Sequence, residues 1–223
     1  MRKAELRLEV AGAGEVSALL LQPADPRALF VLGHGAGAGM RHAFMEGVAH
    51  RLASRGFASL RYQFPYMEQG RHRPDGQPML LATVRAAVGT AADRLPALPL
   101  LAGGKSMGGR MTSLAAAASP LAPVRGVVLF GFPLHAAGRP ATERAAHLAE
   151  VALPLLFLQG TRDRLADLSL LGPICRKLGP RAALHVIEGA DHGFAVHRKT
   201  GRTREAVLEE LADVTAEWAA PLL

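Results

Sequence analysis

Ser106 lies in the segment GGKSMGGR, residues 103–110, where four glycines surround a single hydroxyl group. A serine hydroxyl becomes an effective nucleophile only when a neighbouring base takes its proton. Residues 104–108 have the form G-x-S-x-G, in which the serine is held on a sharp turn between a strand and a helix. The apolar segment LPLLAGG runs into this turn, and MTSLAAAAS after it favours a helix. The pattern therefore predicts a nucleophilic serine on a strained turn and argues against a flexible loop.

A base and an acid that could activate Ser106 follow it in the chain. Asp163 ends the segment GTRD after the apolar run 154–160, and His192 lies in ADHGF after the run 182–189. Both lie where a strand is predicted to end, and the order serine, aspartate, histidine accompanies a G-x-S-x-G turn of this kind. We therefore expect His192 to take the Ser106 proton and Asp163 to orient the imidazole ring.

Two other aspartates lie near the same loops and compete for the role of the acid. Asp167 is expected inside a helix over 165–178, which would point it away from His192, whereas Asp191 adjoins that histidine in sequence. Aspartates in turns commonly accept hydrogen bonds from nearby backbone N–H groups. Asp191 is therefore expected to shape its own loop.

The segment HGAGAG, residues 34–39, follows another apolar run and could supply part of an oxyanion hole. Negative charge on a substrate oxygen requires N–H donors that are already in place. One donor is expected from the backbone of Met107, directly after the nucleophile, and the second from Ala36, with Gly35 or Gly37 as alternatives. A plain glycine-rich turn is another interpretation. A phosphate-binding loop fits less well because no Walker lysine follows.

Residues that flank these groups could line the substrate pocket. The candidates are His34, Gly35, Gly37 and Lys105. Lys105 and other basic residues could favour an anionic substrate, although ordinary exposed positions explain such charges better. No metal site is expected, because His34 and His42 have no further ligands at the usual spacing. The expected chemistry needs no organic cofactor.

The elements that must position these residues alternate along most of the chain. Two strands lead, and strands and helices then follow one another, which predicts an α/β fold with a mostly parallel central sheet and helices on both faces. We expect one domain over 1–223, in which the segment 133–150 could form at most a small cap. Strands are expected at 4–10, 16–22, 28–33, 57–64, 98–104, 124–132, 154–160 and 182–189, and helices at 44–56, 80–94, 111–119, 165–178 and 203–218.

The composition argues against a nucleic-acid-binding or membrane protein. The net charge is +7, but the basic residues are mostly scattered, and the clusters at 71–73 and 197–204 lack interleaved aromatic residues. The single cysteine excludes an internal disulfide, and acidic residues interrupt the N-terminal segment, so no export signal is expected. No apolar run approaches the ~20 residues of a membrane span. We therefore expect a cytoplasmic protein.

The chain resembles the α/β-hydrolase superfamily over nearly its whole length. Four segments carry this resemblance in the order of that family's motifs: HGAGAG as the oxyanion loop, GKSMGG as the nucleophile turn, GTRD as the acid and GADHGF as the base. More narrowly, the chain resembles the small, nearly capless dienelactone-hydrolase-like branch of this superfamily. The segments that carry this resemblance are RYQFPYMEQGRHRPD (61–75), GGKSMGGR and GFPLHAAGRP (131–140). That branch includes bacterial hydrolases of unknown substrate and testis-expressed and NSL-complex-subunit homologues. The resemblance implies an α/β-hydrolase fold with a minimal cap. Dienelactone hydrolases proper use a cysteine where this chain has Ser106, so lactone ring opening is not implied.

These residues predict a serine hydrolase that cleaves carboxylic esters or related small acyl compounds through an acyl-enzyme intermediate. The alternative is a non-catalytic protein of the same fold that binds a partner, since fold does not imply function. All three positions of the expected triad are filled, which a scaffold does not need. The sequence predicts neither the acyl group nor the oligomeric state.

Overall fold

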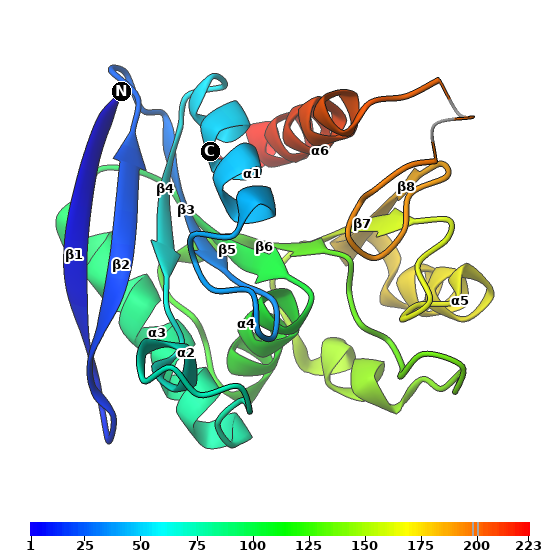
Figure 1. Ribbon diagram of the computed structural model, residues 1–223, viewed down its shortest axis with the longest axis horizontal. Coiled ribbons are helices and arrows are strands. Elements are labelled where there is room, and N and C mark those ends of the chain that lie inside the picture. Colours follow the sequence, from blue (N-terminus) through cyan, green and yellow to red (C-terminus); the bar gives the residue numbers. More distant parts are fainter. Residues whose placement is uncertain (198, 200) are drawn as a thin grey trace.

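An eight-stranded sheet forms the centre of the computed structural model, which describes residues 1–197, 199 and 201–223 (Figure 1). The strands are β1 (Arg2–Val10), β2 (Gly14–Gln22), β3 (Ala28–Gly33), β4 (Phe57–Tyr62), β5 (Leu100–Lys105), β6 (Val124–Phe130), β7 (Leu155–Gly160) and β8 (Ala182–Ile187). Their order in the sheet is β1-β2-β4-β3-β5-β6-β7-β8. β2 pairs antiparallel with both β1 and β4, and all other neighbours are parallel. The predicted mostly parallel sheet is confirmed.

Burial explains why these segments form strands. Every residue of β3, β4, β5 and β7 is buried, as continuous apolar runs predict for strands covered on both faces. At the sheet edge, β1 alternates between more and less exposed side chains along much of its length. Ligand sites in parallel sheets lie beyond the carboxyl ends of the strands. Lys105, Gly160 and Ile187 mark three such ends.

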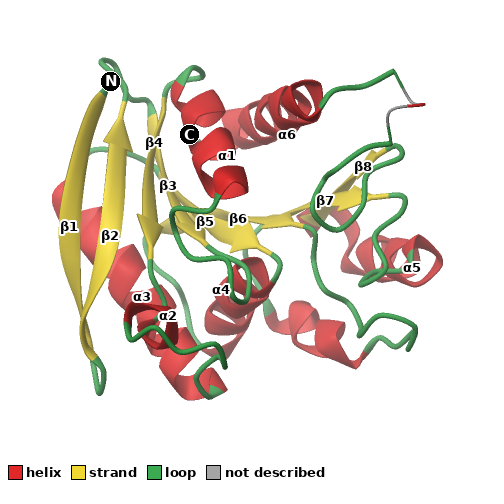
Figure 2. Cartoon of the chain, viewed as in Figure 1, coloured by secondary structure: helices red, strands yellow, loops and turns green. Residues whose placement is uncertain are grey.

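Helices cover both faces of the sheet (Figure 2). Along β6, Val128 and Phe130 join one apolar core and Val127 and Leu129 join the other, because successive side chains of a strand point to opposite faces. The first core includes side chains of α1 and α6, and the second includes side chains of α3, α4 and α5. These helices are α1 (Ala43–Ala53), α3 (Gln77–Arg94), α4 (Met107–Ala118), α5 (Leu168–Leu178) and α6 (Arg204–Ala219).

Short helical turns complete the fold. The segment 133–150, a candidate for a small cap, contains the 3₁₀ helix η1 (Glu143–Glu150), which packs against α4 and places Ala145 and Leu148 in the core. The described part of the chain therefore carries no separate cap. Within that part, no helix combines the length and apolar character that crossing a membrane requires. The remaining short elements are α2 (Pro65–Glu68), η2 (Gly179–Arg181) and η4 (Ala220–Leu222).

Most differences from the expected elements are small shifts at their ends, but the start of α5 matters for the site. The helix expected from residue 165 begins at Leu168, and Asp167 is its N-cap. The Asp167 carboxylate accepts a hydrogen bond from the Ser169 N–H at 2.8 Å. The expectation that Asp167 lies inside the helix is therefore wrong. The reason is that aspartate satisfies free N–H groups at a helix start better than it fits a helix interior.

Candidate active site

Ser106 forms the turn between β5 and α4 and has a strained backbone, with φ of 50° and ψ of −114°. Such a conformation persists in a non-glycine residue only where the surrounding structure enforces it. A Cβ atom on Gly104 would lie 2.2 Å from the carbonyl oxygen of Gly33, and one on Gly108 would lie 2.3 Å from the same oxygen. The end of β3 thus approaches the turn so closely that both flanking positions require glycine.

A continuous chain of hydrogen bonds joins the three residues expected to act together. Nε2 of His192 lies 2.9 Å from the Ser106 hydroxyl oxygen, and Nδ1 of His192 lies 2.7 Å from Oδ2 of Asp163. The three residues come from the loops after β5, β7 and β8, far apart in sequence. An ionised carboxylate can only accept, so the Nδ1–H donates to Asp163 and the Nε2 lone pair faces the serine. This is the tautomer that can take a proton from Ser106.

The Asp163 side chain is completely buried, and its oxygens are well supplied with donors. Oδ1 accepts from the backbone N–H of Leu165 at 2.8 Å, and Oδ2 accepts from the side-chain amide of Gln159 in addition to His192. A buried carboxylate needs such bonds to remain charged. Sequence reasoning missed Gln159. The signal that could have found it is a single polar residue at the end of the otherwise apolar run LLFLQG of β7.

The two competing aspartates have other contacts. Oδ1 of Asp191 accepts from the backbone N–H groups of Gly193 and Ala195 at 2.8 and 2.9 Å, so this side chain shapes the loop that carries His192, as expected. Asp167 caps α5 instead. Among the aspartates of these loops in the described chain, Asp163 is the one hydrogen-bonded to the His192 imidazole.

The loop 34–39 lies against the turn that carries Ser106. A Cβ atom on Gly35 would be 3.7 Å from the Ser106 Cβ atom. The Gly37 N–H donates to the Tyr66 hydroxyl at 3.0 Å and is therefore already used. Within the described residues, the N–H of Ala36 makes no hydrogen bond, and neither does that of Met107 at the start of α4. These two donors are available for a substrate oxygen.

A segment after β4 holds this loop in place. Tyr66 binds Gly37, and the Gln63 side chain accepts from the Met40 N–H at 2.9 Å. The Phe64 N–H donates to Nε2 of His34 at 3.2 Å. Glycines have no side chains with which to anchor themselves, so the loop depends on these contacts. The sequence alone predicts no role for these residues, because no local pattern shows that 63–66 would lie beside 34–40.

His34 was expected near the substrate pocket, but its ring is entirely buried. Its Nδ1–H donates to the Gly35 carbonyl oxygen at 2.7 Å, and burial lowers the pKa of His34 to about 4. The ring is therefore neutral at pH 7 and connects the loop to Phe64 from behind.

Lys105 was also a pocket candidate, and its ammonium group is buried near the His192 ring. The residue is 9% exposed, and Nζ lies 5.4 Å from the centre of the Phe194 ring and 5.9 Å from that of Phe44. A Cβ atom on Gly131 would meet Nζ at 3.0 Å and the His192 ring at 3.5 Å. Nζ has no hydrogen-bond partner among the described residues. Burial lowers the pKa of Lys105 to about 8, although the charges of Asp163 and Asp191 oppose this shift.

A second serine–histidine pair lies on α4 and η1. The Ser113 hydroxyl oxygen is 2.8 Å from Nε2 of His147, and Ser113 also donates to the Arg110 carbonyl oxygen. Burial and the charge of Arg110 lower the pKa of His147 to about 4. No carboxylate in the described chain is hydrogen-bonded to His147, so this pair lacks the group that would orient a base. It joins two packed elements.

No group of three or more His, Cys, Asp or Glu side chains is placed to hold a metal ion within the described ranges.

The arrangement of sheet, turn and loops is that of a known family. Residues 26–220 match the family described as alpha/beta hydrolase domain. The chain belongs to this family. The predicted resemblance to small α/β-hydrolases is thus confirmed, whereas the similarity to testis-expressed and NSL-complex-subunit proteins stays a prediction.

Solved structures share the fold of this α/β-hydrolase over almost its full length. A dienelactone hydrolase from Anabaena variabilis has a TM-score of 0.76 and 21% identity, with 98% of this chain and 96% of that chain covered. A serine hydrolase without a lid from Xanthomonas campestris has a TM-score of 0.76 and 19% identity, with 98% and 95% covered. The esterase domain of a Rhodothermus marinus protein has a TM-score of 0.74 and 17% identity, with 98% of both chains covered.

Two sequence relatives from Mycobacterium tuberculosis carry a different name. Each is 30% identical over 214 residues and is called "Putative phosphoribosyl transferase". The match covers 94% of this α/β-hydrolase but 44% of each relative. The chain therefore spans less than half the length of these proteins.

We predict that Gly108→Ala destabilises the protein by about 3 kcal/mol, because its Cβ atom would collide with the β3 backbone, which cannot move aside as a side chain can. The matched control is Gly89→Ala. Gly89 is an exposed residue of α3 where an added Cβ atom meets nothing within 4 Å. The control should gain up to about 1 kcal/mol from helix propensity. Urea unfolding of both variants gives the comparison, and equal stabilities would contradict the steric account of the motif.

We predict that Lys105→Met stabilises the protein at pH 7 by up to about 3 kcal/mol, since a lysine pKa lowered by burial means that the folded state disfavours the ammonium form. This cost is complete below pH 8 and disappears as the pH rises from about 8 towards the ordinary value of 10.5. The variant's advantage in urea unfolding should therefore shrink between pH 8 and pH 10. The exposed Lys177→Met serves as control and should show no such trend. A constant advantage for Lys105→Met across this range would refute the buried ammonium.

Proposed function

We propose that this α/β-hydrolase is a serine hydrolase that cleaves carboxylic esters or related small acyl compounds through an acyl-enzyme intermediate. The observation that carries the proposal is the hydrogen-bonded chain from the Ser106 hydroxyl through His192 to the buried Asp163 carboxylate. A hydroxyl, a base in the correct tautomer and an orienting acid together are what nucleophilic attack by serine requires.

In the first half of the proposed reaction, Oγ of Ser106 attacks the substrate carbonyl carbon while Nε2 of His192 takes the hydroxyl proton. The carbonyl oxygen becomes negatively charged and accepts hydrogen bonds from the Met107 and Ala36 N–H groups. When the tetrahedral intermediate collapses, the bond to the leaving group breaks. The leaving alcohol receives the proton from His192, and the acyl group stays on Ser106.

In the second half, His192 takes a proton from a water molecule, which attacks the acyl carbon. The same N–H donors stabilise the second oxyanion. The bond to Ser106 then breaks, the serine regains its proton from His192, and a carboxylic acid leaves. Asp163 remains ionised throughout and stabilises the imidazolium that forms in each half.

The fold family and its esterase-like neighbours support a hydrolase activity. The transferase name belongs to relatives more than twice as long as the matched region, so it is not carried over to this chain. The non-catalytic alternative has no supporting contact at the site, because a binding scaffold gains nothing from an imidazole between a hydroxyl and a buried carboxylate. Because the described residues form no separate cap, we expect a small acyl substrate that enters directly over the strand ends.

We predict that a fluorophosphonate probe labels the protein once, at Ser106, because the probe phosphorus takes the place of the acyl carbon. Mass spectrometry of the labelled peptide reads the site. Ser106→Ala should remove labelling completely, whereas the control Ser113→Ala should label normally because the Ser113–His147 pair lacks an acid. An unlabelled native protein, or labelling that follows Ser113, would overturn the assignment.

We predict that Asp163→Asn lowers kcat on an activated ester by ~10⁴, because the tautomer of His192 is no longer controlled. Asp167→Asn is the matched control and should leave kcat nearly unchanged, since asparagine also serves as an N-cap. Thermal melts of both variants establish that they fold. A disabled Asp167→Asn beside a normal Asp163→Asn would show that the acid is misassigned.

A further inference from the structure

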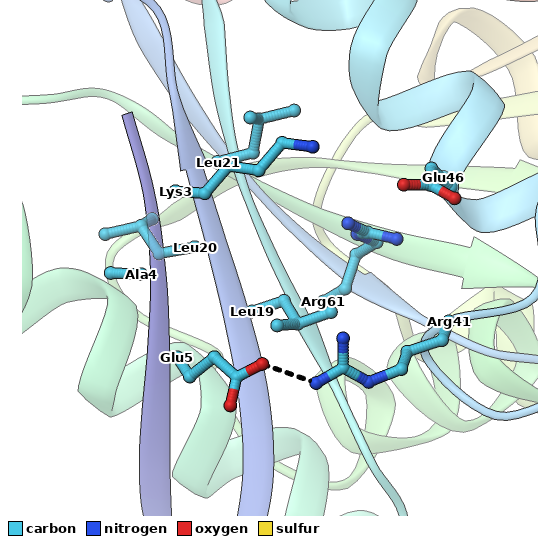
Figure 3. Close-up of a pocket in the computed structure, with 9 residues that line it drawn as sticks. All are labelled: Lys3, Ala4, Glu5, Leu19, Leu20, Leu21, Arg41, Glu46 and Arg61. Atoms are coloured by element: carbon cyan, nitrogen blue, oxygen red, sulfur yellow. Dashed lines mark hydrogen bonds and ion pairs between the residues drawn. The ribbon is translucent and has the colours of Figure 1, made fainter. Parts of the chain in front are cut away.

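A cleft of about 300 Å³ lies on the face of the sheet beside α1, where strands β1, β2 and β4 extend past that helix. Figure 3 shows its side chains, which come from the two leading strands, from β4 and from the region where α1 begins. No triad residue lines it. The lining residues are Lys3, Ala4, Glu5, Leu19, Leu20, Leu21, Arg41, Glu46 and Arg61.

Arg61 is the unusual member of this set, because it is a guanidinium in a residue that is 4% exposed. Its Nη1 donates to the Met40 carbonyl oxygen at 3.1 Å. Nε is buried and Nη2 lies beside it, and neither donates a hydrogen bond to any described residue. Guanidinium groups stay protonated in proteins, and a buried N–H without an acceptor is costly. Arg61 therefore presents an incompletely satisfied positive charge to the cleft.

The neighbouring charged side chains do not form an ion pair with Arg61. Arg41 is paired with Glu5 at 2.6 Å, so these two charges offset each other. Burial lowers the pKa of Arg61, and the negative charge of Glu46 opposes this shift. The two side chains are more than 4 Å apart, however, and form no ion pair. Lys3 points its ammonium into the same space (Figure 3). Three cations and two carboxylates leave the lining with one net positive charge.

We propose that this cleft binds the carboxylate group of a small organic monoanion between Arg61 and Lys3. A carboxylate forms strong charge-assisted hydrogen bonds with a guanidinium, and a single negative charge matches the net charge of the lining. Leu19, which is partly exposed on the same face of β2 as the buried Leu21, offers apolar surface to the body of such a ligand. Glu46 disfavours anions with two charges, so inorganic phosphate fits less well.

The position of the cleft connects it to the active site. The guanidinium that would hold the carboxylate also holds Met40, the residue directly after the loop 34–39. An occupant would therefore contact the group that anchors one end of this loop. The binding proposal itself does not depend on the hydrolase function.

The test is a titration of isotope-labelled protein with sodium butyrate, followed by backbone amide chemical shifts, against sodium chloride at equal ionic strength. We expect saturable shifts at residues 3–5, 19–21 and 40–46, with a dissociation constant of roughly 1–10 mM, as a few polar contacts allow. Any occupation of the active site would move the amides of 106–108 and 192–194 separately, so the two sites are distinguished in one experiment.

Variants of exposed residues give the decisive comparison. Lys3→Met should weaken butyrate binding about threefold and Glu46→Gln should strengthen it about threefold, as expected for single charges near the surface. The matched control Arg2→Met should bind as the native protein does, because its side chain points to the opposite face of β1. Arg61→Met should abolish binding. Should this buried variant fail to fold, the opposite effects of the two exposed variants still test the site.

Three results would overturn the proposal. The first is the absence of saturable shifts at the cleft amides beyond those in sodium chloride. The second is equal affinity in Lys3→Met, Glu46→Gln and the native protein. The third is binding of inorganic phosphate as tight as that of butyrate, which would mean that the cleft does not select a carboxylate monoanion.

Discussion

The carbonyl oxygen of Gly33, at the end of β3, lies against both glycines that flank Ser106. This contact sets the distance between β3 and the turn at Ser106, and it leaves no room for a side chain at either glycine position. The turn is packed against the end of β3, and this packing holds Ser106 in a strained backbone conformation that an unconstrained chain rarely adopts. The hydroxyl is consequently presented beyond the strand ends, where the loops after β7 and β8 can reach it.

Other parts of the site are also positioned by contacts with neighbouring segments of the chain. The glycine-rich loop after β3 is anchored by Gln63 and Tyr66, and His34 connects it to the backbone of Phe64. Asp163 is held by its own loop and by Gln159. The groups that would meet a substrate are therefore positioned before it arrives, as electrostatic stabilisation of a transition state requires.

This positioning includes features that reduce stability. Lys105, directly before Ser106, is buried without a hydrogen-bond partner among the described residues, and the charges of Asp163 and Asp191 and two aromatic rings compensate its charge only in part. Arg61 carries a second incompletely satisfied charge at the far side of the loop 34–39. Buried charges of this kind cost folding free energy, and they are tolerated where a site depends on them. Lys105 lies next to Ser106, and Arg61 binds the residue that follows the loop 34–39.

The sequence by itself determined the order of strands and helices, the turn at Ser106 and the positions of Asp163 and His192. Each of these follows from a local pattern, such as an apolar run that ends in a polar residue, or a glycine where a side chain cannot fit. Only the tertiary structure decided that Gln159 supports Asp163, that Tyr66 holds Gly37, that Asp167 caps a helix and that the ammonium of Lys105 lies near the His192 ring. These contacts depend on which distant segments come within hydrogen-bond distance. The packing of the sheet and its loops sets that distance, and no local periodicity encodes it.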